Sequence, residues 1–168
     1  GINVGKTSLI NRITLNSFED VYKATIGSDF MTTKIIKDGY QISLNFWDIA
    51  GGLRPKDQPH VFYKGANLAI CVVDVLDAET YHTALVWKVE LDDRFENATP
   101  DTEGDGLKNV PIFIVANKLD KCFGEHRVAS IDNIYRFKGE NGFTFGACVS
   151  AKDTTGIDEL KVVIMNTL

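Results

Sequence analysis

The sequence predicts an α/β fold, in which a mostly parallel sheet carries helices on both faces and one antiparallel hairpin strand. Three observations support this class. Short apolar runs of the kind found in buried parallel strands recur along the 168 residues. Segments with helical periodicity separate these runs. The dipeptide Asp38-Gly39, between two strand-like runs, is a hairpin signal.

The expected elements follow in order. Lys6–Leu15 is predicted to be a helix, because Leu9, Ile10 and Ile13 fall on one face. The strands are expected over Ser28–Lys37, Gln41–Asp48, Leu68–Val75, Val110–Ala116 and Phe143–Val149. The other predicted helices are Ala78–Phe95 and a closing helix over Thr155–Leu168, with its inward face formed by Ile157, Leu160, Val163 and Ile164. The acidic stretch Asn97–Asn109 predicts an exposed insertion, and a separate binding surface is the alternative.

Composition and charge narrow the class of protein. The length suits a single domain over residues 1–168, with 44% hydrophobic and 24% charged residues. A net charge of −5 and a pI near 5.2 argue against a nucleic-acid partner. The three cysteines have no metal-binding spacing, and Cys71 and Cys148 lie in apolar runs that favour buried thiols in a reducing compartment. No run approaches the roughly 20 apolar residues that a membrane-spanning helix needs.

Asn117-Lys118-Leu119-Asp120 follows a buried strand and suggests a base-binding loop. The Asp120 carboxylate can accept two hydrogen bonds from the ring N–H and exocyclic amine of guanine, which adenine cannot donate. Asn117 and Lys118 would hold the loop and cover the purine. Alone, the tetrapeptide more often marks a surface turn, so its position in the fold carries the prediction.

The segment Gly1-Ile-Asn-Val-Gly-Lys-Thr7 resembles the end of a phosphate-binding loop that opens a helix. Lys6 would reach the β- and γ-phosphates and the Thr7 hydroxyl would bind Mg²⁺. The first glycine of such a motif would precede Gly1, as would the strand that feeds the loop, so we expect the protein to extend beyond its printed N-terminal end. An ordinary helix start is the alternative.

Two more motifs follow predicted strands at the edge where ligands bind in such sheets. Asp48-Ile-Ala-Gly51 offers a carboxylate for magnesium and a backbone N–H for the γ-phosphate. Ser150-Ala-Lys152 offers the Ala151 N–H to the O6 atom of guanine. Taken alone, each of these two motifs would be interpreted as an ordinary turn. Their order along the chain favours a single nucleotide site.

Taken together, these residues resemble the Rab family of Ras-like small GTPases over the whole chain. The specific matches are Tyr22–Phe30, with its Ile-Gly-x-Asp-Phe signature, Trp47–Gly51 and Phe62–Ala66. The resemblance implies a P-loop NTPase small G-protein fold with a six-stranded sheet, whose first strand, absent from the printed chain, would lie between Gln41–Asp48 and Leu68–Val75. Within the family, the chain is most similar to the late-endosomal and lysosome-related-organelle branch.

The resemblance also implies the roles of individual residues. GTP or GDP would contact Asn3, Val4, Gly5, Lys6, Thr7, Ser8, Phe18, Tyr22, Thr25, Gly51, Asn117, Lys118, Asp120, Ser150, Ala151 and Lys152. Magnesium would be held by Thr7, Thr25 and Asp48, and catalysis would depend on Lys6, Thr25 and Gly51. Effectors would be bound by Ile26, Gly27, Asp29, Phe30, Trp47 and Phe62, in which the three aromatic residues form a hydrophobic triad.

The chain departs from the family pattern at two positions that bear on hydrolysis. Gly52 stands where the family has the glutamine that orients the attacking water, and Leu53-Arg54-Pro55 replaces a Glu-Arg-Phe run. Ile2 lies in the phosphate loop where small residues are usual, and would crowd the water or an arginine finger. We therefore expect slow hydrolysis, intact nucleotide binding, and a gain on Gly52→Gln. Substitution of the missing glutamine by Gln58 or by a partner protein is the alternative.

The resemblance implies a switch in vesicle trafficking that recruits effectors in its GTP state. Its partners would be an exchange factor, a GTPase-activating protein, a GDP-dissociation inhibitor and effectors. A prenylated C-terminal tail would hold this monomer on the cytosolic face of endosomal or lysosomal membranes. Two alternatives stay open: a GTP-bound scaffold that rarely hydrolyses, and a P-loop kinase or ATPase. Asp120 argues against the second, because its carboxylate would repel the acceptor N1 of adenine.

Overall fold

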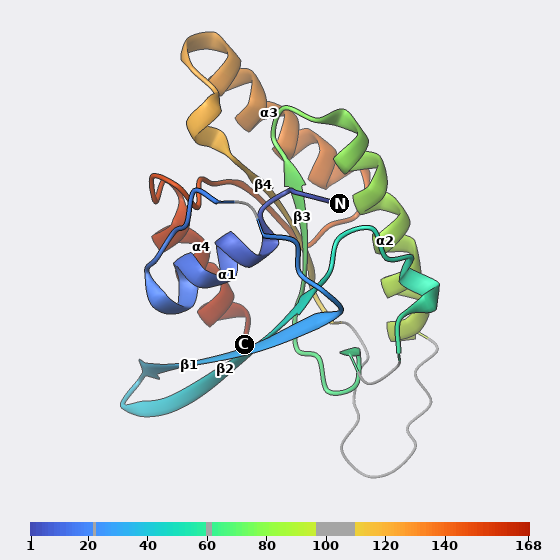
Figure 1. The fold of residues 1–168 in the computed structure, drawn as a ribbon, viewed down its shortest axis with the longest axis vertical. Coiled ribbons are helices and arrows are strands. Elements are labelled where there is room, and N and C mark those ends of the chain that lie inside the picture. The colour runs from blue at the N-terminus through green and yellow to red at the C-terminus, as the bar shows by residue number, and fades with distance from the viewer. Residues whose placement is uncertain (22, 60–61, 97–109) are drawn as a thin grey trace.

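The computed structural model describes residues 1–21, 23–59, 62–96 and 110–168 of the chain (Figure 1). Tyr22 and the expected insertion Asn97–Asn109 lie outside these ranges. The described elements, in chain order, are α1 (Lys6–Leu15), β1 (Ser28–Lys37), β2 (Tyr40–Ile49), η1 (Pro55–Asp57), β3 (Ala69–Asp74), α2 (Ala78–Glu96), β4 (Ile112–Asn117), η3 (Leu119–Lys121), α3 (Gly124–Glu140), β5 (Phe145–Cys148) and α4 (Ile157–Thr167).

The described strands form two sheets. β3, β4 and β5 make a parallel sheet in that order, and the register pairs Asp74 with Asn117 at the carboxyl ends of β3 and β4. β1 and β2 make an antiparallel pair whose turn consists of Asp38 and Gly39, both in the left-handed region with φ of 51° and 82°. Two successive positive φ angles match the twist of a tight hairpin. The predicted α/β class and the hairpin are confirmed.

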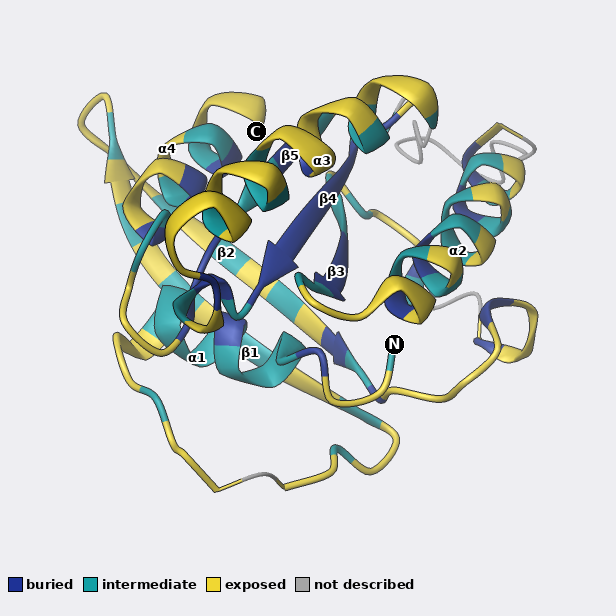
Figure 2. Cartoon of the chain, turned by 90° about the horizontal axis from the view of Figure 1, so that it is seen from above, coloured by how far each residue is buried: buried dark blue, intermediate teal, exposed yellow. Residues whose placement is uncertain are grey.

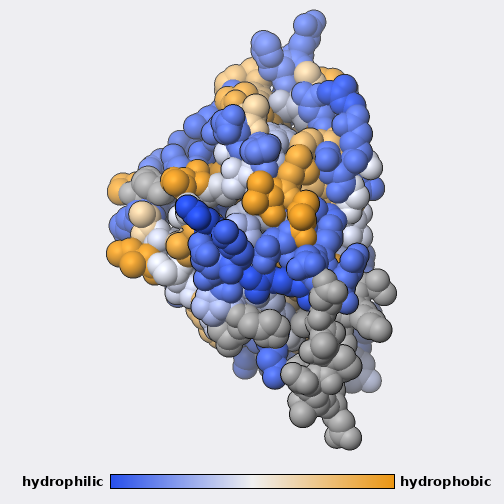
Figure 3. Space-filling model, turned by 90° about the vertical axis from the view of Figure 1, so that its right-hand side faces the viewer, coloured by the Kyte–Doolittle hydropathy of each residue, from blue (hydrophilic) through white to orange (hydrophobic). Residues whose placement is uncertain are grey.

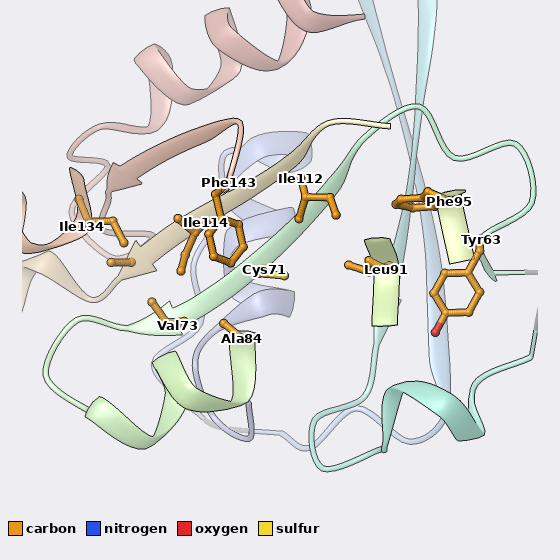
Figure 4. Packing of buried hydrophobic residues seen from close by; sticks show 11 residues of the cluster. Tyr63, Cys71, Val73, Ala84, Leu91, Phe95, Ile112, Ile114, Ile134 and Phe143 are labelled. Atoms are coloured by element: carbon orange, nitrogen blue, oxygen red, sulfur yellow. The ribbon is translucent and has the colours of Figure 1, made fainter. Parts of the chain in front are cut away.

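Helices cover both faces of the parallel sheet. On one face, α2 and α3 pack against the strands through Ala84, Leu91 and Ile134, and Figure 4 shows these side chains beside Cys71 and Ile114 of the sheet. On the other face α1 and α4 pack against Val72, Phe113 and Val115 through residues including Leu9, Leu160 and Ile164. Figure 2 shows the result: β4 is buried along its length, while the helices keep exposed outer faces.

A groove of about 1,220 Å³ separates the two sheets, because β2 and β3 do not pair in the described structure. Its walls include residues of β2, β3, α1 and α2, among them Trp47, Ile70, Ile13 and Leu91. This is where the family resemblance puts a further strand, which stays a prediction. None of the helices in the described ranges is both long and apolar enough to cross a bilayer.

The described structure contains three elements that were not predicted, namely helix α3 and the short 3-10 helices η1 and η3. α3 was not expected from the sequence, although Val128, Ile131, Ile134 and Phe137 recur at intervals of three residues. Only Ile134 among the helix residues is fully buried, so most of α3 is polar and its amphipathic signal is weak. The other differences are shifts of one or two residues at the ends of elements, which is where periodicity is least informative.

Candidate functional site

The predicted site motifs meet at the carboxyl ends of the parallel strands. Asn117 is the last residue of β4, and Ser150 follows β5 after two residues. The two loops are joined by the Leu119 N–H, which donates to the Val149 carbonyl at 3.0 Å, and by the Val149 N–H, which donates to the Ala116 carbonyl at 2.8 Å. The short parallel strands therefore bring these two loops, far apart in sequence, to one edge of the sheet.

The phosphate loop turns tightly into α1. Asn3 and Gly5 have positive φ angles of 55° and 88°, and Lys6, Thr7 and Ser8 form the first turn of the helix. Gly5 is required by its surroundings as well, because a Cβ there would lie 2.4 Å from the Asn117 Nδ2 atom. The free N–H groups of the helix start make this turn suitable for an anion such as phosphate.

Two hydrogen bonds tie the base-binding loop to the phosphate loop. The Asn117 Nδ2 donates to the Val4 carbonyl at 3.0 Å, and the Lys118 ammonium donates to the Asn3 carbonyl at 2.5 Å. Lys118 also forms an ion pair with Asp74 at 2.8 Å, which fixes it to the end of β3. The separation between the two loops is thus set by protein contacts alone.

Lys6 lies partly buried inside the phosphate loop, where its ammonium donates to the Gly1 carbonyl at 3.0 Å. Burial lowers its pKa from the ordinary value of 10.5, while the negative charge of Asp48 raises it. A desolvated ammonium is stabilised by a nearby anion. A phosphate group in the loop would supply that charge.

One corner of the site is formed by Thr7, Thr25 and Asp48. The two threonine hydroxyls lie 2.9 Å apart, the Thr25 hydroxyl donates to Asp48 Oδ2 at 3.3 Å, and the Thr7 hydroxyl donates to the same oxygen. Asp48 is only 2% exposed, and its Oδ1 atom is buried without a hydrogen-bond partner within the described structure. A buried, unpaired carboxylate oxygen beside two hydroxyls is the donor set that a hard cation such as Mg²⁺ prefers. The residues therefore fit the metal.

The base-binding side is held by hydrogen bonds of its own. Asp120 accepts from the Ser150 hydroxyl at 2.8 Å through Oδ1, and the Ala151 N–H donates to the Asn117 side-chain oxygen at 3.0 Å. Lys152 pairs with Asp20 at 2.9 Å, and the hydrogen bond and charge of that carboxylate raise the pKa of Lys152.

The Lys152 ammonium lies 6.0 Å from the centre of the Phe18 ring. The aromatic residue predicted to contact the base is therefore beside the same loop.

The predicted aromatic triad forms a continuous cluster. The Phe30 and Trp47 rings are 4.8 Å apart, and the Trp47 and Phe62 rings are 5.3 Å apart. Phe30 is 48% exposed and Trp47 45% exposed, although large aromatic side chains are usually buried. Figure 3 shows that the molecular face carrying α2 has apolar groups set among hydrophilic ones.

The remaining residues of the predicted effector surface lie just before and at the start of β1. Ile26 is 94% exposed, the Gly27 carbonyl accepts from the Ala50 N–H at 3.0 Å, and the Asp29 carboxylate accepts from the Phe30 N–H at 2.8 Å. This segment therefore presents its side chains outward while its backbone is joined to the end of β2.

Position 52 faces the Ile2 side chain. Gly52 has a φ of +86°, and a Cβ there would lie 3.2 Å from Ile2 Cδ1 and 3.3 Å from Ile2 Cγ1. The neighbouring Gly51 is closer still to the loop, since its Cβ would lie 2.8 Å from both the Gly1 oxygen and Ile2 Cα. The two departures from the family pattern therefore adjoin each other, because any side chain at position 52 would meet that of Ile2.

Sequence reasoning missed three residues of this region. Asp74 holds Lys118, Asp20 holds Lys152, and Arg12 donates to the loop that contains Ala151. Asp74 had a usable signal, because it ends a buried strand as Asn117 does. No sequence pattern marked Arg12 or Asp20. Tyr22, predicted to contact nucleotide, lies outside the described residues.

A phosphate-binding turn at a helix start, a carboxylate–hydroxyl corner and a carboxylate-bearing base loop together define a P-loop nucleotide-binding protein of the small G-protein type. The family model described as "Ras family" matches residues 1–168. The chain belongs to the Ras family.

Curated relatives narrow the assignment further. The chain is 34% identical over 166 residues to the Ras-related protein Rab-7L1 of Homo sapiens, which covers 98% of this chain and 77% of the relative. It is 32% identical over 166 residues to the Ypt/Rab-type GTPase Rab7 of Gibberella zeae, with 98% and 77% covered. It is 34% identical over 155 residues to the Ras-related protein Rab-32C of Dictyostelium discoideum, with 92% and 64% covered.

These matches confirm the resemblance to the Rab branch of Ras-like GTPases. The chain is a Rab-type GTP-binding switch of membrane trafficking, and guanine-nucleotide binding and GTPase activity come with that membership. Membership also brings regulators and effectors in general, and an association with endomembranes.

Proposed function

We propose that the chain binds GTP and GDP with Mg²⁺ through the residues expected from its sequence, and that it hydrolyses GTP slowly. The observation that carries the binding proposal is the pair of hydrogen bonds from Asn117 and Lys118 to the phosphate loop. They fix the distance between the base loop and the phosphate loop through contacts within the protein. Preorganisation of this kind reduces the entropy cost of binding.

Each end of the nucleotide has its own set of residues in this proposal. Asp120 engages Ser150 through Oδ1 and would use its carboxylate to accept the ring N–H and the exocyclic amine of guanine. The backbone of Val4 and Gly5 and the ammonium of Lys6 would hold the phosphates. Phe18 and Lys152 would contact the base from the side, and Tyr22 keeps the role expected from its sequence.

Thr7, Thr25 and Asp48 would hold magnesium, which neutralises phosphate charge and stabilises the charge that develops during phosphoryl transfer. The unpaired Oδ1 of Asp48 supports this assignment, because a bound cation would remove the cost of burying it. Thr25 would also cap the γ-phosphate, and the Gly51 N–H would donate to it. Closure of the 25–30 segment would then depend on which nucleotide is bound.

Slow hydrolysis follows from Gly52 and Ile2. Glycine has no amide to orient water, and the Ile2 side chain occupies the space beside position 52. Gln58 is a poor substitute in this arrangement, because it is 7% exposed and η1 is held against α2 by Arg94, whose Nη2 donates to the Pro55 carbonyl at 3.4 Å. A glutamine or an arginine finger from a partner would have to enter past Ile2.

Family membership favours a cycling switch over a permanent scaffold, so we propose a switch whose GTP state is long-lived. Effectors would bind Ile26, Gly27, Asp29 and the triad of Phe30, Trp47 and Phe62. The partially exposed triad supports this surface, because clustered aromatic side chains are common anchors of interfaces.

The specific partners follow the Rab pattern. We propose an exchange factor, a GTPase-activating protein and a GDP-dissociation inhibitor, with a prenylated C-terminal tail that attaches the monomer to late-endosomal or lysosome-related membranes on their cytosolic side. Analysis of the full reading frame for C-terminal cysteines, followed by fractionation of cells that express the tagged protein, tests this placement. Recovery away from those membranes would contradict it.

Two measurements on the full-length protein test the nucleotide proposal. A thermal-shift titration with magnesium should show stabilisation by GTP and GDP but not by ATP. Equal protection by ATP would overturn the guanine assignment. Single-turnover hydrolysis should then be at least about tenfold slower than in a glutamine-bearing Rab, since misplacing a reacting group can cost about 10²-fold. A rate equal to that Rab would overturn the hydrolysis proposal and leave the binding proposal standing.

A further inference from the structure

Arg12, in the last turn of α1, reaches across the fold to the loop after β5. Its Nε donates to the Ala151 carbonyl at 2.8 Å, and its Nη2 donates to the Lys152 carbonyl at 3.2 Å. Its Nη1 donates to the Asn16 carbonyl at 2.8 Å, which satisfies the end of the helix as well. All three nitrogens of one guanidinium are therefore engaged with backbone oxygens.

The Ala151 residue is consequently held on both sides. Its N–H donates to Asn117 at 3.0 Å while its carbonyl accepts from Arg12, and Ala151 is only 2% exposed. Hydrogen bonds from a charged donor are about twice as strong as neutral ones. The rigid guanidinium fork also fixes the direction of two carbonyls, which a lysine could not do.

α1 makes this contact part of a larger link. The helix runs from Lys6, in the phosphate loop, to Leu15, and its ten residues span about 15 Å. Arg12, in its last turn, reaches the base loop. Position and orientation of the base loop are thus coupled to the same rigid helix whose first turn would hold the phosphates.

We infer that Arg12 is a positioning residue for guanine: it sets the Ala151 peptide, whose N–H donates to the Asn117 side chain here and would share that hydrogen with the atom at position 6 of the base. This inference rests on the proposed function. By fixing that loop to α1, Arg12 also slows nucleotide release. It touches no part of the nucleotide and acts through Ala151 and Lys152.

The first test is the release of GDP from the full-length protein carrying Arg12→Met, which keeps the length of the side chain and removes every donor. Loss of charged hydrogen bonds worth about 1.5–3 kcal/mol corresponds to about 10- to 100-fold, so release should be at least about tenfold faster. Arg12→Lys, which keeps a single donor group, should release GDP at a rate between those of the wild-type protein and Arg12→Met. Arg136→Met is the matched control, because Arg136 bonds only the exposed Asn133 in the described structure.

The second test isolates the position-6 atom. The preference of the wild-type protein for GDP over 6-thio-GDP, whose sulfur accepts hydrogen bonds weakly, should collapse in Arg12→Met. The preference for GDP over IDP, which lacks only the exocyclic amine expected to meet Asp120, should stay unchanged. A variant that merely loosens the fold would lower both preferences together.

The outcomes separate the two proposals. Wild-type release rates in Arg12→Met, or an equal loss of both preferences, would overturn the inference about Arg12 while leaving guanine binding intact. Absence of any guanine preference in the wild-type protein would instead overturn the proposed function. If Arg12→Met fails to fold, Arg12→Lys carries the test, with release faster than wild type expected and unchanged release refuting the inference.

Discussion

Restoring a glutamine at position 52 should not by itself restore hydrolysis, because Ile2 and the local backbone oppose it. A side chain at Gly52 must adopt a φ of +86° and place its Cβ 3.2 Å from Ile2 Cδ1. Non-glycine residues rarely take that conformation. The informative perturbation is therefore the pair Gly52→Gln and Ile2→Gly, made singly and together.

The expected changes in hydrolysis rate follow from the backbone strain at position 52 and from its proximity to Ile2. Correct placement of the water is worth about 10²-fold. A left-handed backbone costs a non-glycine residue about 1–2 kcal/mol, or roughly tenfold in the population of the productive arrangement. The contact with Ile2 must also give by a few tenths of an ångström. Gly52→Gln alone should therefore accelerate hydrolysis less than about tenfold.

Removing the Ile2 side chain changes the result, because it frees the space that a Cβ at position 52 would need. The double variant should therefore accelerate hydrolysis by more than Gly52→Gln alone, with about 10²-fold as the upper limit, because the positive φ at position 52 still costs part of the gain. Ile2→Gly alone should give no gain in intrinsic hydrolysis, since no amide is present to orient water. The combined effect should thus exceed the product of the single effects, as expected for residues in direct contact.

The assay is single-turnover hydrolysis of GTP loaded onto the full-length protein, with GDP and GTP affinities measured in parallel. Gly39→Gln is a matched control for backbone strain, because Gly39 has a φ of +82° and no atom within 4 Å of its added Cβ. A full recovery of rate by Gly52→Gln alone would refute the reasoning. A double variant whose acceleration equals the product of the two single effects would refute it as well.

Three further predictions concern binding and stability. Asp120→Asn should weaken GTP binding by at least about 100-fold and favour XTP, measured by titration, because its amide can donate to the O2 of xanthine where Asp120 would accept from an amine. Gly5→Ala should abolish nucleotide binding and lower the unfolding temperature far more than Gly39→Ala, since only the first adds a clash with Asn117 to the same backbone strain. Burial raises the pKa of the Cys71 thiol from 9.0 to about 12, so the folded state should resist iodoacetamide at pH 8. Stability from the protonated thiol should be complete below pH 9 and be lost as the pH rises toward 12, and a Cys71→Ala variant should show a weaker loss.

Much of the base site could be predicted from sequence because its residues sit at fixed offsets from strongly patterned strands. Asn117 ends the fully buried strand β4, and the register places it opposite Asp74. A residue at the end of such a strand must face the ligand edge of the sheet. The same logic located Ser150, the second residue after β5, and Asp48, near the end of β2, although β2 belongs to the antiparallel pair. Pattern and position together predicted where these side chains would meet.

The features that escaped prediction depend on contacts between residues far apart in the chain. Arg12 meets Ala151 across 139 positions, and Ile2 meets Gly52 across 50, so no local pattern marks either pair. Ile2 and Gly52 looked like two independent departures from the family. Helix α3 was missed for a different reason: it buries one residue fully and carries little periodic signal.

Two routes lead out of the GTP state, and we propose that each is slowed by a different part of this structure. Hydrolysis would be opposed at Gly52 and Ile2, which are neighbours but make none of the hydrogen bonds that join the base loop to the phosphate loop. Release would be opposed by Asn117, Lys118 and Arg12, whose hydrogen bonds hold the two loops. Because the two sets are separate, substitutions in one should leave the other unchanged, and a long-lived GTP state would end only when a partner protein acts on one of them.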